Sequence, residues 1–172
     1  MIQSMKRGKN MKLTHAGVGN SQYSLQEYYE KDRISKECQN KVNTSDILIM
    51  PYKYNEDFYF ADESVSFYKY CKNKSLDQDI DILADDNIKV RSLHSFDIWM
   101  PLIFIATEIL LPIIINVVSD YINEKRKGRE DEPCDVDITF KVKHGNDVKE
   151  LHYKGSAEAF KDNFEKIDIN KL

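Results

Sequence analysis

The stretch that decides the fold lies in the middle of the chain and reads IWMPLIFIATEILLPIIINVV, from Ile98 to Val118. Sixteen of its 21 residues are apolar, whereas the whole chain of 172 residues is 41% hydrophobic and 31% charged. A helix of about 20 apolar residues is as long as a bilayer core is thick. We therefore predict one long hydrophobic helix over residues 97–123, which the rest of the protein, a partner or a membrane must cover.

Polar residues recur at every fourth position in the second half of this stretch, namely at Glu108, Pro112, Asn116 and Asp120. In a helix, this spacing places them in one row on an otherwise apolar surface. The row favours contact with protein over contact with lipid, because a glutamate in the middle of a bilayer is costly without a partner. We interpret Glu108 and Asn116 as the polar residues that determine which partner this otherwise apolar surface binds.

Three further residues complete this candidate interaction site. Trp99 and Phe104 flank the polar row as apolar contact residues. Pro112 is expected to kink the helix or to split it into two shorter ones, because proline cannot donate an intrahelical hydrogen bond. The site would join the protein to a protein partner or to a second copy of itself.

A single-pass membrane helix is the alternative. Trp99 and Tyr121 would sit at the two interfaces, and Lys125–Lys127 would form a cytoplasmic anchor. Both orientations of such a helix conflict with the positive-inside rule. Residues 1–45 carry a net charge of +4, and they would lie on the opposite side of the membrane from Lys125–Lys127. We favour the reading in which the helix does not span a membrane.

The segments before the stretch predict a β-α-β unit. A strand is expected over Asp46–Tyr54, where four consecutive apolar residues indicate coverage on both faces and Pro51 should weaken the pairing. A helix capped by Asp62 or Ser64 follows, and then a strand over Asp79–Ala84. A third short strand is expected over Ile88–Leu93.

The segments after the stretch predict a charged linker and a hairpin. The linker covers residues 124–134, and the hairpin covers Val136–Lys154, with His144–Asp147 as its turn. A C-terminal helix follows from Ala157. The expected fold class is α+β: residues 46–172 form one domain, preceded by an N-terminal extension, 1–45, that is basic, partly flexible and contains one helix over 25–40.

Composition and charge exclude several classes of protein. The net charge is −4 and no basic surface covers a whole domain, so duplex nucleic acid is not the expected partner. The three cysteines, Cys38, Cys71 and Cys134, are isolated, which argues against a disulfide framework and a zinc site. The start lacks the apolar core of a signal peptide, so we expect a cytoplasmic protein, with membrane anchoring as the alternative.

No motif indicates a catalytic site. The acidic residues Asp77–Asp86 lack the glycine and the glutamate of a calcium loop, and strand alternation explains Asp79 and Asp81. His144 and His152 fall on the same hairpin and could be neighbours, but two histidines alone are a weak metal signal. The tyrosine-rich segment 52–70 could stack bases, although its acidic surroundings favour a protein contact or core packing. We expect no cofactor and no metal ion.

The order of elements resembles that of the small effector-associated constant component proteins of bacterial conflict and anti-phage systems. The resemblance covers about residues 46–165: the β-α-β half, an apolar helix with prolines, a basic linker and a hairpin with a glycine-containing turn. It implies a non-catalytic adaptor that couples an effector to a sensor. No functional residue is carried over from it.

Three functions follow from the sequence. The first is a non-enzymatic adaptor that associates through the hydrophobic helix. The second is a single-pass membrane protein acting as a pore-forming or signalling effector. The third, which lacks a supporting motif, is a small metal-dependent hydrolase or nuclease that uses Asp79, Asp81 and nearby acids.

Overall fold

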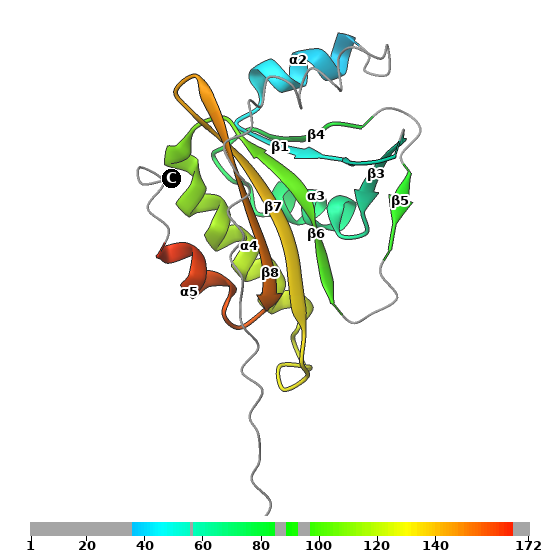
Figure 1. Cartoon of the computed structure of the whole chain (residues 1–172), viewed down its shortest axis with the longest axis vertical. Coiled ribbons are helices and arrows are strands. Elements are labelled where there is room, and N and C mark those ends of the chain that lie inside the picture. Colours follow the sequence, from blue (N-terminus) through cyan, green and yellow to red (C-terminus); the bar gives the residue numbers. More distant parts are fainter. Residues whose placement is uncertain (1–35, 56, 85–88, 93–96, 167–172) are drawn as a thin grey trace, which may run out of the picture.

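A computed structural model of the chain describes residues 36–55, 57–84, 89–92 and 97–166 (Figure 1). Residues 1–35 of the N-terminal extension, with most of the helix predicted over 25–40, lie outside these residues. The described part of the N-terminal extension is a helix, α2, from Lys36 to Thr44.

Five strands form the main sheet, in the order β4-β1-β6-β7-β8. Their bounds are β1 Ile47–Met50, β4 Ile80–Ile82, β6 Ile98–Ile105, β7 Asp135–His144 and β8 Asp147–Ser156. The sheet is mixed: β1 runs parallel to β4 and β6 runs parallel to β7, whereas β1 with β6 and β7 with β8 are antiparallel. The two parallel pairs are each joined through a helix, so the chain contains two β-α-β units.

Three helices cover one face of this sheet, which we call the helical face. They are α3 (Ser64–Asn73), α4 (Leu111–Lys125) and α5 (Phe160–Glu165), and a short 3-10 turn, η1 (Glu108–Leu110), leads into α4. Their apolar residues pack in one core with residues of β1, β6, β7 and β8. Helix α2 lies on the opposite face, where Cys38 packs with Leu48 and Phe104 (Figure 1).

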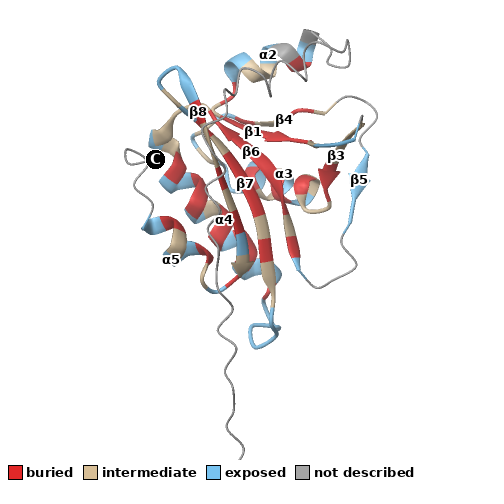
Figure 2. Ribbon diagram, in the orientation of Figure 1, coloured by how far each residue is buried: buried red, intermediate tan, exposed pale blue. Residues whose placement is uncertain are grey.

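A second, three-stranded sheet lies beside the first, in the order β2-β3-β5. Its strands are β2 (Tyr52–Tyr54), β3 (Asp57–Ala61) and β5 (Val90–Arg91). Pro51 separates β1 from β2, as predicted from its missing donor. Asn55 turns the chain from β2 toward β3 with a φ of 56°, which asparagine tolerates better than most residues. Figure 2 shows that β5 is exposed while β1, β6 and β7 are mostly buried.

The prediction of one hydrophobic helix over 97–123 is wrong. Its first third is β6, the central strand of the main sheet, and only Leu111–Lys125 is α-helical. Pro101 lies where the register between β6 and β7 shifts, a position at which a central strand can accommodate a residue without an N–H group. A continuous run of apolar residues is compatible with a strand covered on both faces and with a buried helix. Hydrophobic periodicity does not distinguish these two structures.

The described residues contain no helix that is both long and apolar enough to cross a bilayer. Helix α4 has 15 residues, and its exposed side carries Asn116, Asp120 and Glu124.

Most other predicted elements are confirmed. The helix after residue 63, the strand after 79 and the hairpin occur close to their predicted bounds, whereas the one strand predicted over 46–54 is two strands, β1 and β2, in different sheets. Gly145 forms the hairpin turn with a φ of 62°. Two details differ. Neither Asp62 nor Ser64 caps α3, because the N-cap position is Glu63 and makes no side-chain cap bond. Strand β3 was not predicted.

Candidate functional site

A row of aromatic side chains joins the small sheet to the start of β6. We call Tyr52, Tyr54, Tyr59, Arg91 and Trp99 the aromatic face. The strand register brings the first four to one side, because Tyr52 pairs with Tyr59 and Arg91 pairs with Ala61, two residues from Tyr59 on the same strand. The alternation within β2 then places Tyr54 on that side as well.

Arg91 links two of the tyrosines. Its guanidinium carbon lies 4.1 Å from the centre of the Tyr54 ring and 5.4 Å from that of Tyr59. Tyr54 is nevertheless 54% exposed, which makes it one of the most exposed large apolar side chains among the described residues. A cation between two ring faces holds both rings in place while leaving their outer surfaces open.

The other end of the face is a stacked pair. The rings of Tyr52 and Trp99 have centroids 5.5 Å apart and are inclined by 29°. The Tyr52 hydroxyl donates to the backbone oxygen of Met100 at 3.2 Å, which fixes the ring against β6. Burial raises the pKa of Tyr52 well above its usual value, so the hydroxyl stays a neutral donor.

Charges around the aromatic face are largely paired. Lys89 lies 5.6 Å from the Tyr59 ring centre and 3.3 Å from Asp57. Near Trp99, whose strand partner on β7 is Asp137, that aspartate contacts His152 at 2.8 Å and Lys154 at 3.9 Å. The face is therefore aromatic and nearly neutral, a composition typical of the centres of protein interfaces.

A second exposed apolar surface lies at the start of α4. We call Ile109, Pro112, Ile113 and Asn116 the α4 patch. Ile109 is 76% exposed, Ile113 is 37% exposed, and Pro112 and Asn116 are exposed too. Nearby, Glu108 is 3.3 Å from Nδ1 of His144, a contact that joins η1 to the end of β7.

The five residues predicted as one interaction site lie in three places. Trp99 belongs to the aromatic face, whereas Phe104 is buried beneath α2 and is removed from the site. Pro112 and Asn116 are in the α4 patch, and Glu108 is half-buried beside it. The strand-to-helix change at residues 106–110 separates the two groups, because a strand and a helix project side chains with different periods.

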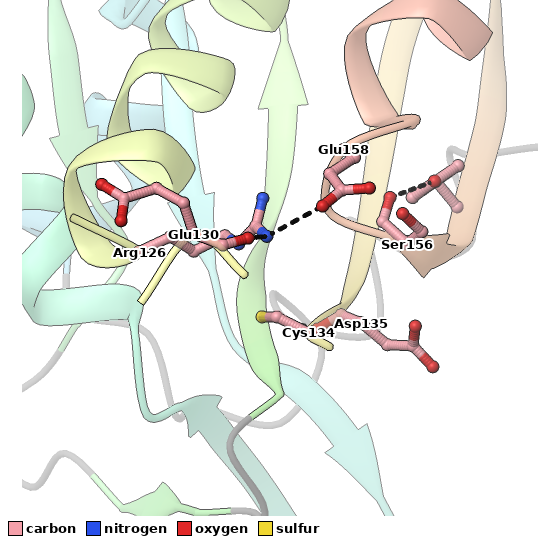
Figure 3. A network of polar contacts seen from close by, with 7 residues as sticks. Arg126, Glu130, Cys134, Asp135, Ser156 and Glu158 are labelled. Carbon is pink, nitrogen blue, oxygen red and sulfur yellow. Dashed lines mark hydrogen bonds and ion pairs between the residues drawn. The ribbon is translucent and has the colours of Figure 1, made fainter. Parts of the chain in front are cut away.

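A polar network surrounds the end of α4 (Figure 3). Arg126 is 9% exposed, and its Nη2 donates to the backbone oxygen of Glu130 at 2.7 Å and to Glu158 at 3.3 Å. A polar cleft of about 190 Å³ lies here, lined by residues from three segments, which include Asp62, Ile98 and Arg126. The contacts of Arg126 tie the α4–β7 connection to the start of α5, which is a structural role.

The acidic residues and histidines weighed above as metal ligands are held by separate contacts. Asp81 contacts Lys41 at 3.4 Å, and the carboxylate of Asp46 accepts the backbone N–H of Asp79 at 2.9 Å, while Asp85 and Asp86 lie outside the described residues. His144 and His152 pair with different strand partners and contact different carboxylates. Within the described ranges, no three His, Cys, Asp or Glu residues are arranged to hold a metal ion.

Sequence reasoning missed Arg91 and strand β3. The sequence around the tyrosines of segment 52–70 indicates acidic surroundings. The structure instead brings Lys89 and Arg91 beside them from 30 to 37 residues further along the chain. The available signal was the alternation of Lys89, Val90 and Arg91 within the predicted third strand.

Comparisons with known protein families, with curated proteins and with solved structures find no match to this chain.

Proposed function

We propose that this protein is a non-enzymatic adaptor that binds a protein partner through the aromatic face. The observation that carries the proposal is the Tyr54–Arg91–Tyr59 stack next to the Tyr52–Trp99 pair. Tyrosine, tryptophan and arginine are the residues that contribute most to binding free energy at protein interfaces, and here they are already held by one another. Holding them in place reduces the entropy lost on binding.

The α4 patch is the second contact in this proposal. It retains Pro112 and Asn116 as interaction residues, now with Ile109 and Ile113 as the apolar part. An adaptor needs two surfaces, and these two are built from different elements, β2, β3, β5 and β6 on one side and η1 with α4 on the other.

The test is site-specific photocrosslinking in the cells that produce the protein. A benzoylphenylalanine at position 54 is expected to capture one protein, which mass spectrometry then identifies. The same residue at position 113 tests the α4 patch. Position 68 on α3 is the control, because Tyr68 also stacks with a cation, Lys72 at 5.5 Å, but lies away from the aromatic face.

Substitution gives the second half of the test. Arg91→Ala removes the cation between two rings and should reduce the capture at position 54 by at least about fivefold. Lys72→Ala, which removes the cation from Tyr68, should leave it unchanged. Equal capture from positions 54 and 68, or none from position 54, would contradict the proposed function.

A further inference from the structure

The two edges of the main sheet differ in length. At one edge, β4 has three residues, whereas at the other edge β8 has ten. Strand β8 contains no proline, and it pairs with β7 over its whole length without a shift of register. In the part of the chain that the structure describes, β7 is the only strand that pairs with β8. A long and regular edge of this kind is a template for a further strand.

The register of the hairpin determines which residues of β8 face this edge. The turn has two residues, so His144 and Asp147 on either side of it form a hydrogen-bonded pair. At the other end of the hairpin, the N–H of Ala157 donates to the backbone oxygen of Cys134 at 2.9 Å, which continues the same alternation. The odd-numbered residues of β8 therefore bond to β7. The even-numbered residues direct their N–H and C=O groups toward the edge, and they include Val148, Glu150, His152 and Lys154.

The side chains along this edge carry charges of both signs. On the face opposite the helices, Glu150 is 3.8 Å from Lys141 of β7, and Lys154 is 3.9 Å from Asp137 of β7. Both reach the surface, because the side chain of Glu150 is 39% exposed and that of Lys154 is 70% exposed. His152 lies midway between them on the strand. A negative and a positive side chain at equal distances from His152 are complementary to themselves after a rotation by half a turn.

A second copy of β8 meets this requirement when the pairing is antiparallel and centred on His152. Edge-facing residues then meet as hydrogen-bonded pairs, with Glu150 of each copy opposite Lys154 of the other. Each of these contacts completes a row of alternating charge across four strands. The row runs from Lys141 and Glu150 of one copy to Lys154 and Asp137 of the other.

Other registers of the same pairing lack this complementarity. Centring it on Glu150 places two glutamates opposite each other, and centring it on Lys154 places two lysines opposite each other. Centring it on Leu151 puts Lys154 opposite Val148 and leaves the lysine without a carboxylate from the other copy. The charges therefore select both the occupant of the edge and its register.

Helix α5 packs on the face of the sheet that these charges do not use. Its Phe164 contacts Phe140 of β7 and Tyr153 of β8, with ring centroids 5.2 Å and 5.8 Å apart. The helix thus lies over the line between the two strands on the helical face, whereas Glu150 and Lys154 lie on the opposite face.

We propose that two copies of this protein form a dimer through the edge of β8, with residues 148–156 of each copy paired antiparallel around His152. The two main sheets then form one continuous sheet. The two-fold rotation keeps both helical faces on one side and both aromatic faces on the other. This inference is independent of the proposed function, because the edge of β8 belongs neither to the aromatic face nor to the α4 patch.

Sedimentation velocity of the full chain measures the association. We expect a dimer whose population rises with concentration in the micromolar range, because a single pair of strands is a small interface. A chain that stays monomeric at about 100 μM would overturn the proposal.

Charge reversal tests the contact between the copies. Glu150→Lys places like charges opposite each other twice in the dimer and should raise its dissociation constant by at least about tenfold, as should Lys154→Glu. The double variant restores opposite charges between the copies, so its dissociation constant should return to within about threefold of the wild-type value. Lys72→Glu, the same change on α3, should have no effect.

Circular dichroism spectra that match that of the wild type show that these variants are folded. A dimer that neither single reversal weakens would associate through another surface and would overturn the proposal. A double variant that dimerises less than both single variants would overturn it too.

A disulfide tests the centre of the pairing. The two copies of His152 should lie opposite each other with about 5.5 Å between their Cα atoms, a separation that a disulfide can bridge. His152→Cys should therefore give a covalent dimer on mild oxidation, seen by electrophoresis without reductant. Glu150→Cys is the matched control, because its two copies are displaced by four residues, or about 13 Å, along the strands.

The wild type, which has three cysteines of its own, sets the background of this experiment. Covalent dimer from position 152 above that background, and none from position 150, is the expected result. Equal amounts from both positions, or none above background from position 152, would overturn the proposed pairing.

Discussion

The two faces of the main sheet are built from the same strands but differ in what covers them. On the helical face, Ile103 of β6 and Phe140 of β7 are 0% exposed beneath α4 and α5. On the opposite face, α2 covers Leu48 and Phe104, and beyond it the surface holds Trp99 and His152. The helical face holds fully buried side chains, whereas the opposite face keeps side chains that are partly exposed. Each prediction below changes one side and asks whether the other responds.

The largest expected effect is on the helical face. Phe140→Ala removes a fully buried ring that packs edge-to-face on Phe164 at 5.2 Å, and it should lower the free energy of unfolding by about 3–5 kcal/mol. Urea unfolding followed by circular dichroism measures the change. Where this variant does not fold, Ile138→Val, also at a fully buried position, should lower it by about 0.5–1.5 kcal/mol. A loss below about 1 kcal/mol for Phe140→Ala would show that this side is not the core.

An intermediate effect is expected from alkaline pH, and Cys71 and Tyr153 contribute to it from the helical face. Burial raises the pKa of the Cys71 thiol and of the Tyr153 hydroxyl to about 12 each. The unfolded chain therefore loses these protons first as the pH rises, starting near pH 9, and the folded state holds them longer. The free energy of unfolding should therefore fall as the pH rises above about 9, and these two groups should not affect it below that pH.

Unfolding in urea at pH 8 and at pH 10 measures this dependence. Cys71→Ala lowers stability at both values by leaving a small cavity, but it should reduce the difference between them, because one of the titrating groups is gone. Cys134→Ala, at a less buried position, is the matched control and should reduce the difference less. An unchanged difference in Cys71→Ala would contradict the assignment.

The smallest effect on stability is expected on the aromatic face. Tyr54→Ala removes an exposed ring and should change the free energy of unfolding by less than about 1 kcal/mol. The same urea titration measures it. A variant that loses partner capture but keeps its stability would support the difference between the two faces. Equal destabilisation by Tyr54→Ala and Phe140→Ala would contradict it.

Much of the fold was predictable from local patterns. The alternation of Val136, Ile138, Phe140 and Val142 indicated a half-covered strand, and all four side chains are 0% exposed on the helical face. The turn at Gly145 followed from the residues that accept positive φ. The continuous apolar run of β1 correctly indicated a strand covered on both faces.

The same argument, applied to Ile98–Ile105, would have predicted β6. Its eight residues are apolar throughout, as are those of β1, and Pro101 is unfavourable inside a helix. The length of the apolar run predicts one helix instead, because the run continues from a strand into a helix with only Ala106 and Thr107 between β6 and η1. The polar row at every fourth residue was informative only for the part that is helical, from Pro112 onward.

The candidate site was less predictable than the fold. Trp99 was selected for its place in the hydrophobic run, but its partner Tyr52 is 47 positions earlier and meets it only because β1 and β6 pair. Arg91 reaches Tyr54 through the pairing of β5 with β3, a strand that no pattern had indicated. Contacts of this kind depend on strand order, which local sequence does not contain.

The position of β6 between β1 and β7 has a consequence for synthesis of the chain. One edge of β6 pairs with β1, whose residues precede their partners by 52 to 58 positions, and its other edge pairs with β7, which begins at Asp135. Until the ribosome has delivered β7, the eight apolar residues of β6 present an unpaired edge, the kind of segment that self-associates. At about 5–20 residues per second, that interval lasts a few seconds, and a chaperone would be needed most within it.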